Sequence, residues 1–348
     1  MLGKLVLCGF VFFALMLSEA SADASSKKPN PVVSEDYFVN AYDPGIQIFV
    51  RNKHPKGMKS FTSDRIVLFV HGSSYPAETS FDLPLDGLSW MDYIAQHGFD
   101  VYLLDVRGYG RSTRPPEMSQ PPEKNPPIVR TATAVKDVDA VVDSILARRK
   151  VSKINLIGWS WGTRIMGSYT SQHNEKVNKL VLYAAGWVSS TPPLFASGTG
   201  PLGAYRTVTM SAAKTRWLTG VAEDKKAALI PAGWFEQWAA ATQASDPEGA
   251  AQNPPVVRAP NGTVQDMREY SKDKPPYDPA LIKVPVLVIN AEWDVDTPPE
   301  MNNVVFSKLV NAPYRRRILL GEGTHTIIME RNRMHLFHEV QLFLEETN

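Results

Sequence analysis

Short apolar runs alternate with segments of helical periodicity along most of this chain. The runs are almost continuously apolar, which is typical of strands buried on both faces of a parallel sheet. They occupy residues 65–70, 101–104, 154–157, 179–184, 284–289 and 317–320, and a weaker alternation over residues 46–50 favours an antiparallel edge strand. Helices are predicted over residues 85–97, 131–149, 300–310 and 334–346. This order of elements predicts an α/β fold with a doubly wound, mostly parallel sheet and helices on both faces.

The alternation stops between residues 188 and 281. This stretch contains Trp217, Trp234 and Trp238, many alanines and frequent proline or glycine, and it shows no buried-strand run. Helical patterns over residues 212–218 and 234–242 predict a mostly helical insertion. Residues 33–187 and 282–348 then form the α/β core.

The first 22 residues have the three parts of a secretory signal peptide. Lys4 gives a positively charged start, residues 5–17 are almost entirely apolar, and Ala20-Ser21-Ala22 offers a cleavage site. We therefore expect cleavage after Ala22, a disordered lead-in over residues 23–32, and a secreted or periplasmic protein. A retained anchor is the alternative, but the apolar run is short for a bilayer span, which needs about 20 residues. We expect no stable membrane insertion after cleavage.

Composition and charge exclude some classes of function. The chain has 37 Lys and Arg against 36 Asp and Glu, a net charge of +1, and its longest basic run is residues 315–317. Nucleic acid is therefore not an expected partner. The single cysteine, Cys8, lies within the predicted signal peptide, so a disulfide framework is not expected either.

The sequence Gly158-Trp159-Ser160-Trp161-Gly162 joins the apolar run at residues 154–157 to helix-compatible residues 163–169. This is the strand, sharp turn and helix that surround a G-x-S-x-G nucleophile elbow. A serine in such a strained turn brings neighbouring chain very close, so the flanking positions favour glycine. We predict that Ser160 is a nucleophile.

A serine nucleophile requires a base, and the base requires an acid that orients it. In parallel sheets the functional groups gather beyond the carboxyl ends of the strands. His325, after the apolar run at residues 317–320, is the predicted base, and Asp294, after the run at residues 284–289, is the predicted acid. Asp296 and Glu292 are alternatives for the acid, although Asp296 is favoured as a cap of the following helix.

Two backbone amides are expected to bind the oxyanion of the tetrahedral intermediate. One is the amide of Trp161, which follows the nucleophile, and the other is that of Ser73 in the loop after residues 65–70. The reaction is then an acyl transfer that is expected to need no metal and no cofactor.

Taken together, these motifs resemble the α/β-hydrolase family over residues 33–348. The resemblance rests on His71-Gly72, Asp105-x-Arg107-Gly108-x-Gly110-x-Ser112, the Ser160 elbow, Asp294 and Gly323-Thr324-His325. It implies an eight-stranded sheet with a helical cap inserted over the site after the sixth strand. The chain looks like the serine-nucleophile, cap-domain members, in an esterase or proline iminopeptidase-like branch, because epoxide hydrolases and haloalkane dehalogenases have aspartate at the nucleophile position.

The aromatic residues around the elbow favour an apolar or aromatic substrate. Trp159 flanks the nucleophile, Trp187 precedes the insertion, and Tyr75 follows the oxyanion loop, so these three are the expected substrate contacts. The expected partner is a small-molecule carboxylic ester. An amide or peptide hydrolase of the proline iminopeptidase type is the alternative within hydrolases, and a non-catalytic binding protein is the alternative outside them.

Overall fold

The computed structural model describes residue 3, residues 30–189, residue 196 and residues 198–347. The predicted signal peptide and most of the lead-in lie outside these described residues, apart from residue 3 and residues 30–32, so both stay predictions. Among the described residues, no helix combines the length and the apolar character needed to cross a bilayer.

Eight strands form one sheet in the order β1-β2-β4-β3-β5-β6-β9-β10. The strands are β1 (Val32–Asn40), β2 (Gln47–Pro55), β3 (Ile66–Val70), β4 (Asp100–Leu104), β5 (Ile154–Trp159), β6 (Val177–Tyr183), β9 (Val286–Ala291) and β10 (Arg315–Leu320). Strand β2 pairs antiparallel with both β1 and β4, and the other pairs in this sheet are parallel. The predicted fold, a mostly parallel eight-stranded sheet with helices, is therefore confirmed.

The burial of the central strands explains why the sequence predicts them and does not predict β1. Every residue of β3, β4 and β5 is buried, in keeping with their apolar sequences. Strand β1 is mostly exposed and was not predicted, because its polar residues give no strand pattern and only its pairing with β2 defines it. Strand β10 forms the opposite edge of the sheet, and most of its residues are partly buried.

Helices cover both faces of the sheet, each over its own hydrophobic cluster. One cluster packs under α3 (Thr131–Arg149), α4 (Trp161–Gln172) and α10 (Pro299–Lys308). The other packs under α1 (Ala77–Phe81), α2 (Trp90–Gln96) and α11 (Arg333–Glu345). The helix predicted over residues 85–97 begins only at Trp90, because Ser89 caps α2 by accepting a hydrogen bond from the Asp92 amide at 2.9 Å.

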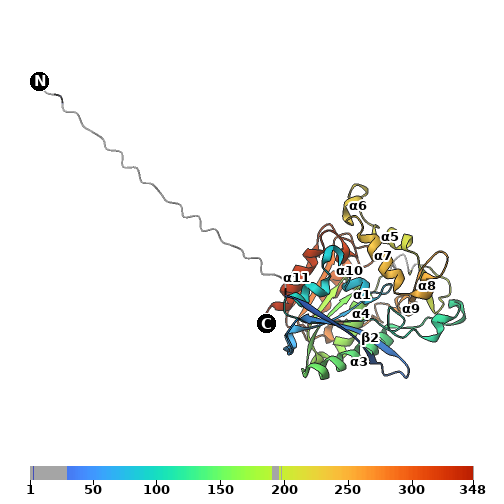
Figure 1. Ribbon diagram of the computed structural model, residues 1–348, viewed down its shortest axis with the longest axis horizontal. Coiled ribbons are helices and arrows are strands. Elements are labelled where there is room, and N and C mark those ends of the chain that lie inside the picture. Colours follow the sequence, from blue (N-terminus) through green and yellow to red (C-terminus); the bar gives the residue numbers. More distant parts are fainter. Residues whose placement is uncertain (1–2, 4–29, 190–195, 197, 348) are drawn as a thin grey trace.

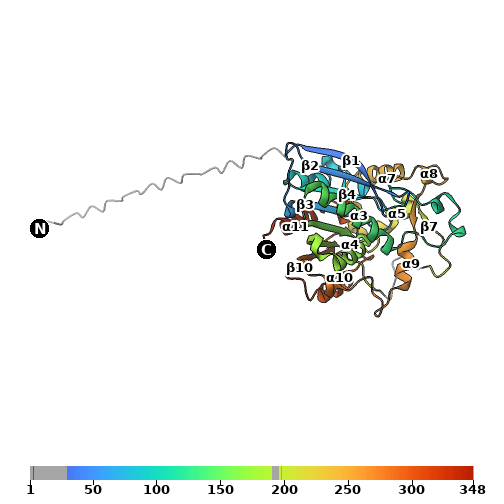
Figure 2. The ribbon, with the colours of Figure 1, turned by 90° about the horizontal axis from the view of Figure 1, so that it is seen from below.

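The segment between β6 and β9 contains α5 (Met210–Trp217), α6 (Glu223–Leu229), α7 (Trp234–Ala244), α8 (Pro247–Ala250) and α9 (Gly262–Glu269). Both views place these helices together at one end of the molecule (Figures 1 and 2). The segment also contains an antiparallel pair of strands that the sequence did not predict, β7 (Tyr205–Val208) and β8 (Val257–Pro260). Each strand has four residues and they pair across a long separation, so no local pattern marks them.

The insertion is fastened to loops at the carboxyl edge of the sheet. Arg206 of β7 donates a hydrogen bond of 2.6 Å to the Ser73 carbonyl, after β3. Trp217 of α5 donates one of 2.8 Å from Nε1 to the buried Glu330, after β10. Burial raises the pKa of the Glu330 carboxyl to about 7, although hydrogen bonds from Thr324 and Trp217 oppose this rise.

The bend between β5 and α4 has no room for side chains at its two glycines. A Cβ at Gly158 would lie 2.8 Å from the backbone nitrogen of Thr163 and nearer still to the Gly162 carbonyl. A Cβ at Gly162 would lie 2.9 Å from the His71 carbonyl oxygen. Between them, Ser160 has φ 57° and ψ −115°, a conformation that non-glycine residues rarely adopt.

We predict that Gly158→Ala lowers the free energy of unfolding by at least ~2 kcal/mol, because overpacking against backbone cannot relax by a change of rotamer. Urea unfolding of the purified protein measures this. Gly200→Ala is the matched control, since a Cβ there meets nothing within 4 Å. Equal stability of the two variants would show that the bend is not sterically constrained.

We predict a second effect, of pH on stability, from Glu330. Its folded-state pKa of about 7 exceeds the ordinary 4.5, so the folded protein retains a proton that the unfolded chain releases. The free energy of unfolding therefore falls as pH rises from about 4.5 to 7. Glu330→Gln removes this loss, so the stability of the variant relative to the wild type should increase by about 2–3 kcal/mol between pH 5 and pH 8. Urea unfolding at pH 5 and pH 8, with Glu345→Gln as the exposed control, tests it; a pH-independent difference would contradict it.

Candidate active site

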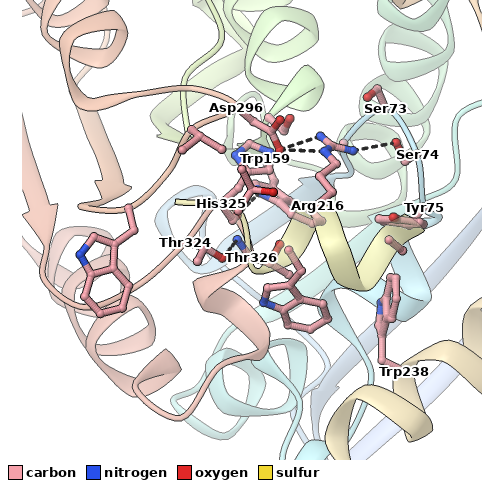
Figure 3. A pocket seen from close by; sticks show the side chains of 17 residues that line it. Ser73, Ser74, Tyr75, Trp159, Arg216, Trp238, Asp296, Thr324, His325 and Thr326 are labelled. Carbon is pink, nitrogen blue, oxygen red and sulfur yellow. Dashed lines mark hydrogen bonds and ion pairs between the residues drawn. The ribbon is translucent and has the colours of Figure 1, made fainter. Parts of the chain in front are cut away.

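A cavity opens at the carboxyl edge of the sheet, below the insertion. It encloses about 560 Å³, its open mouth included. Ser160 and His325 line it from the core, and Arg216, Trp217 and Trp238 line it from α5 and α7 (Figure 3). The parallel direction of β3, β5, β9 and β10 explains why loops far apart in sequence meet here.

Ser160 lies at the bend between β5 and α4 and is held by backbone contacts. Its amide donates to the Tyr183 carbonyl at 3.0 Å. A Cβ on Gly72 would approach the Ser160 Cβ to 3.3 Å, so the loop after β3 passes directly beside the serine. Ser160 is partly exposed to the cavity, whereas its neighbours Trp159 and Trp161 are buried.

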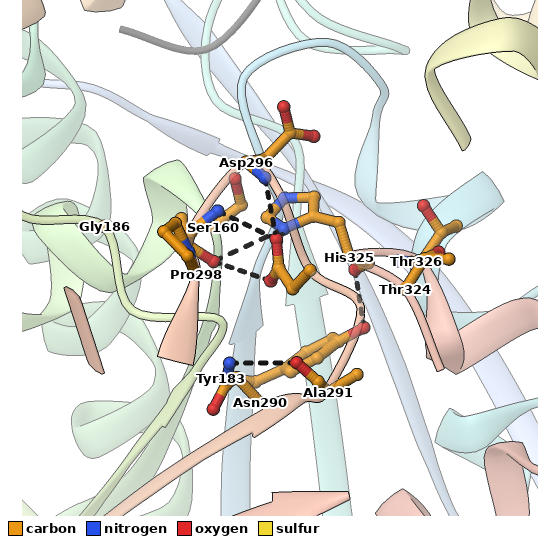
Figure 4. A network of polar contacts seen from close by, with 12 residues as sticks. Ser160, Tyr183, Gly186, Asn290, Ala291, Asp296, Pro298, Thr324, His325 and Thr326 are labelled. Atoms are coloured by element: carbon orange, nitrogen blue, oxygen red, sulfur yellow. Dashed lines mark hydrogen bonds and ion pairs between the residues drawn. The ribbon is translucent and has the colours of Figure 1, made fainter. Parts of the chain in front are cut away.

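The structure brings His325 and Asp294 together. Nδ1 of His325 lies 2.9 Å from Oδ2 of Asp294, and both side chains are almost fully buried. Asp294 is itself oriented by Thr297, whose hydroxyl donates to Oδ2 at 2.7 Å and whose amide donates to Oδ1 at 2.8 Å. Figure 4 shows the His325 ring in this network. With Nδ1 on the carboxylate, Nε2 is the ring nitrogen left to accept a proton.

The backbone of His325 is anchored as firmly as its ring. Its carbonyl accepts hydrogen bonds from Trp159 Nε1 at 3.1 Å and from the Tyr183 hydroxyl at 2.9 Å. Burial disfavours the charged imidazolium, but the neighbouring Asp294 carboxylate outweighs burial and raises the pKa of His325. Trp159, predicted as a substrate contact, thus lines the cavity and also positions the histidine loop.

The two predicted oxyanion donors lie beside the serine. Within the described part of the chain, neither the Ser73 amide nor the Trp161 amide donates a hydrogen bond. The loop is fixed from behind, because the Ser73 carbonyl accepts from the Tyr109 hydroxyl at 2.8 Å. His71 also fixes it by accepting from the Val106 amide at 3.0 Å, and burial lowers the pKa of His71 to about 4, which keeps it neutral.

Of the three candidate acids, only Asp294 contacts His325. Glu292 instead accepts a hydrogen bond from the Glu322 amide at 3.1 Å. The expectation that Asp296 caps the next helix is wrong. Its carboxylate forms a 2.8 Å ion pair with Arg216 and lines the cavity (Figure 3). The amides of Asp296 and Thr297, just before the helix, donate their hydrogen bonds to Asp294 instead.

The aromatic residues of the cavity differ from those expected. Tyr75 lines it as predicted and packs edge-on against Trp238, with ring centroids 4.8 Å apart. Trp187 does not line it. Its ring packs against Tyr277 in the hydrophobic cluster on the α4 side of the sheet, because the chain turns away after β6. Trp217 and Trp238 replace it, and the sequence could not show which face of each helix meets the core.

Comparisons with known proteins agree with this architecture. The profile of the alpha/beta hydrolase fold matches residues 65–331. A thermophilic esterase from Thermogutta terrifontis is similar in structure, with a TM-score of 0.54 and 16% identity over 89% of this chain and 98% of that one. An esterase from Exiguobacterium antarcticum has a TM-score of 0.55 and 18% identity over 90% of this chain and 100% of that one. Est816, described as an N-acyl homoserine lactone degrading enzyme, has a TM-score of 0.55 and 16% identity over 88% of this chain and 100% of that one.

At 16% to 18% sequence identity, these likenesses show a shared fold and nothing further. No curated protein matches the chain significantly in sequence. The family profile covers most of the chain, and the eight-stranded sheet with its elbow after β5 agrees with it. The chain belongs to the α/β-hydrolase fold family.

Proposed function

We propose that this protein is a serine hydrolase that cleaves carboxylic esters with an aromatic or apolar group. The observation that supports it most directly is the 2.9 Å contact between His325 Nδ1 and Asp294 in the wall of the cavity that Ser160 also lines. Neither folding nor packing requires a serine in a strained turn, a histidine and a buried carboxylate to meet at one cavity. A non-catalytic binding protein is therefore the weaker alternative.

The first half of the reaction forms an acyl-enzyme. Nε2 of His325 takes the proton of the Ser160 hydroxyl while Oγ attacks the ester carbonyl carbon. The oxygen of the tetrahedral intermediate accepts hydrogen bonds from the Ser73 and Trp161 amides, each worth on the order of 3 kcal/mol in the transition state. When the intermediate collapses, His325 returns the proton to the departing alcohol.

The second half releases the acid. A water molecule attacks the Ser160 ester, and Nε2 of His325 accepts the proton from that water. Collapse of this second intermediate gives the proton to Oγ, which regenerates the serine. Asp294 orients the ring and stabilises its charged form in both halves.

The walls of the cavity support an apolar or aromatic group on the substrate. Trp217, Trp238 and Tyr75 offer rings that bury flat apolar surface. Among the described lining residues the only carboxylate is Asp296, and it is paired with Arg216. A free amino terminus, as in a substrate of the proline iminopeptidase type, would need an acidic partner, so an ester is favoured. The esterases and the lactone-degrading enzyme among the structural neighbours support the same class.

Ser160→Ala should reduce kcat for phenyl acetate or p-nitrophenyl butyrate by at least ~10³-fold, because the acyl-enzyme can no longer form. Steady-state hydrolysis assays on the purified protein measure this. Ser168→Ala, on α4 and away from the cavity, is the control and should keep its activity. Activity in Ser160→Ala equal to that of the control would remove Ser160 from the mechanism.

The pH profile should report the raised pKa of His325. Since only the neutral ring accepts a proton, kcat/KM is expected to rise with pH through a midpoint above the ordinary 6.5. Asp294→Asn removes the charge that raises this pKa, so the midpoint should move to lower pH and the plateau should fall by ~10³- to 10⁴-fold. Glu292→Gln is the control. An unchanged midpoint in Asp294→Asn would contradict the assigned role.

A further inference from the structure

A second, smaller cavity adjoins Ser160, and Tyr75, Trp217 and Trp238 of the larger cavity do not line it. It encloses about 290 Å³ and shares Ser73, Ser160 and Asp296 with the larger cavity. Arg164 of α4 and Thr263 of α9 line it and take no part in the mechanism above. A substrate with its carbonyl at Ser160 therefore has space for one group in each cavity.

Arg164 is buried without a carboxylate partner. The residue is 6% exposed, and its Nη2 donates one hydrogen bond of 3.2 Å to the Trp187 carbonyl. Among the described residues its Nε has no hydrogen-bond partner and no ion pair joins it, while its Cζ lies 5.8 Å from the centroid of the Tyr270 ring. The Asp266 carboxylate influences the charge of Arg164, but Asp266 already accepts hydrogen bonds from Arg130 and from the Thr131 amide.

The surroundings leave space for this guanidinium and add a second unused polar group. A Cβ on Gly186 would lie 2.9 Å from Cζ and Nε of Arg164, so a larger residue there would displace the guanidinium from this position. Thr263 is 1% exposed, and its hydroxyl has no hydrogen-bond partner within the described ranges. Burial also lowers the pKa of Arg164, which reflects the cost of a desolvated charge that no anion neutralises.

We propose that the smaller cavity binds a carboxylate that the substrate carries a few atoms from its scissile carbonyl, with Arg164 and Thr263 as the donors. This inference rests on the proposed ester hydrolysis and specifies its substrate. Arginine suits a planar carboxylate, and its buried position makes each charge-assisted hydrogen bond strong. Asp296 also lines the cavity; its ion pair with Arg216 offsets its charge, but it would disfavour a doubly charged phosphate.

The substrate is then an ester with an aromatic or apolar group on one side and a short carboxylate-bearing group on the other. Two arrangements meet this description. The carboxylate belongs either to the acyl group, as in a half-ester of a short dicarboxylic acid, or to the alcohol, as in an ester of a short hydroxy acid. Hydrolysis by Ser160 breaks the same bond in both and releases an acid and an alcohol.

Two pairs of esters that differ only in a carboxylate test the inference. Monobenzyl succinate is compared with benzyl butyrate, and 3-(phenylacetoxy)propanoate with propyl phenylacetate. We expect kcat/KM to favour the anionic member of one pair by roughly 10- to 100-fold, because the neutral ester leaves the Arg164 and Thr263 donors unsatisfied. The pair that shows the preference identifies the side that carries the carboxylate.

The preference should disappear in Arg164→Met and decrease in Thr263→Val. It is measured as the ratio of kcat/KM within each pair, so that a change common to both esters of a pair cancels. Arg164→Lys keeps the charge without the planar fork and should retain part of the preference. The matched controls are Arg333→Met, a buried arginine that donates to the Leu85 carbonyl, and Thr242→Val, a buried threonine without a partner; neither residue lines the two cavities. Both controls should keep the preference.

Equal kcat/KM within both pairs for the wild type, or a preference that survives in Arg164→Met, would overturn the carboxylate site. Failure to hydrolyse any of the four esters would instead count against the proposed function. In that case calorimetric binding of monobenzyl succinate to Ser160→Ala, which cannot turn it over, tests the cavity separately. Binding that weakens at least ~10-fold on adding Arg164→Met supports the site, and unchanged binding overturns it.

Discussion

The steric constraint at the bend after β5 determines the geometry of the whole site. Because Gly158 and Gly162 carry no side chains, α4 begins directly against the loop after β3, and Ser160 is forced into a strained conformation between them. The same close approach places the Ser73 and Trp161 amides beside the serine. Backbone strain of this kind persists only where the surrounding structure holds it, and here the buried strands on either side of β5 do so.

The histidine loop is positioned from several directions at once. Asp294 holds the ring of His325, Trp159 and Tyr183 hold its carbonyl, and Glu330 joins the loop to Trp217 of the insertion. Each of these groups is buried, so each hydrogen bond is protected from competition with water. The insertion is therefore linked to the histidine loop, because Glu330 accepts hydrogen bonds from Trp217 of α5 and from Thr324, which precedes His325.

Charge is distributed unevenly around the serine. The larger cavity has aromatic walls and one internal ion pair, between Arg216 and Asp296. The smaller cavity has Arg164, whose charge meets no carboxylate among the described residues. A buried cation without a counterion is unfavourable for folding alone. This asymmetry gives the two sides of a bound ester different chemical environments.

The sequence by itself determined the parallel core and two members of the site. Strands buried on both faces must be apolar throughout, so most of them are visible as runs, and Ser160 and His325 follow from their places after such runs and between glycines. The tertiary structure decided the rest. It brings Asp294, and not Glu292, to His325 and pairs Asp296 with Arg216. It places Trp217 and Trp238 in the wall of the larger cavity, and Trp187 against Tyr277 outside that wall. It also pairs β7 with β8 and places Arg164 in the wall of a cavity beside Ser160, with no ion pair to any residue that the structure describes. These outcomes depend on which face of an element meets another element distant in sequence, and local periodicity contains no record of such contacts.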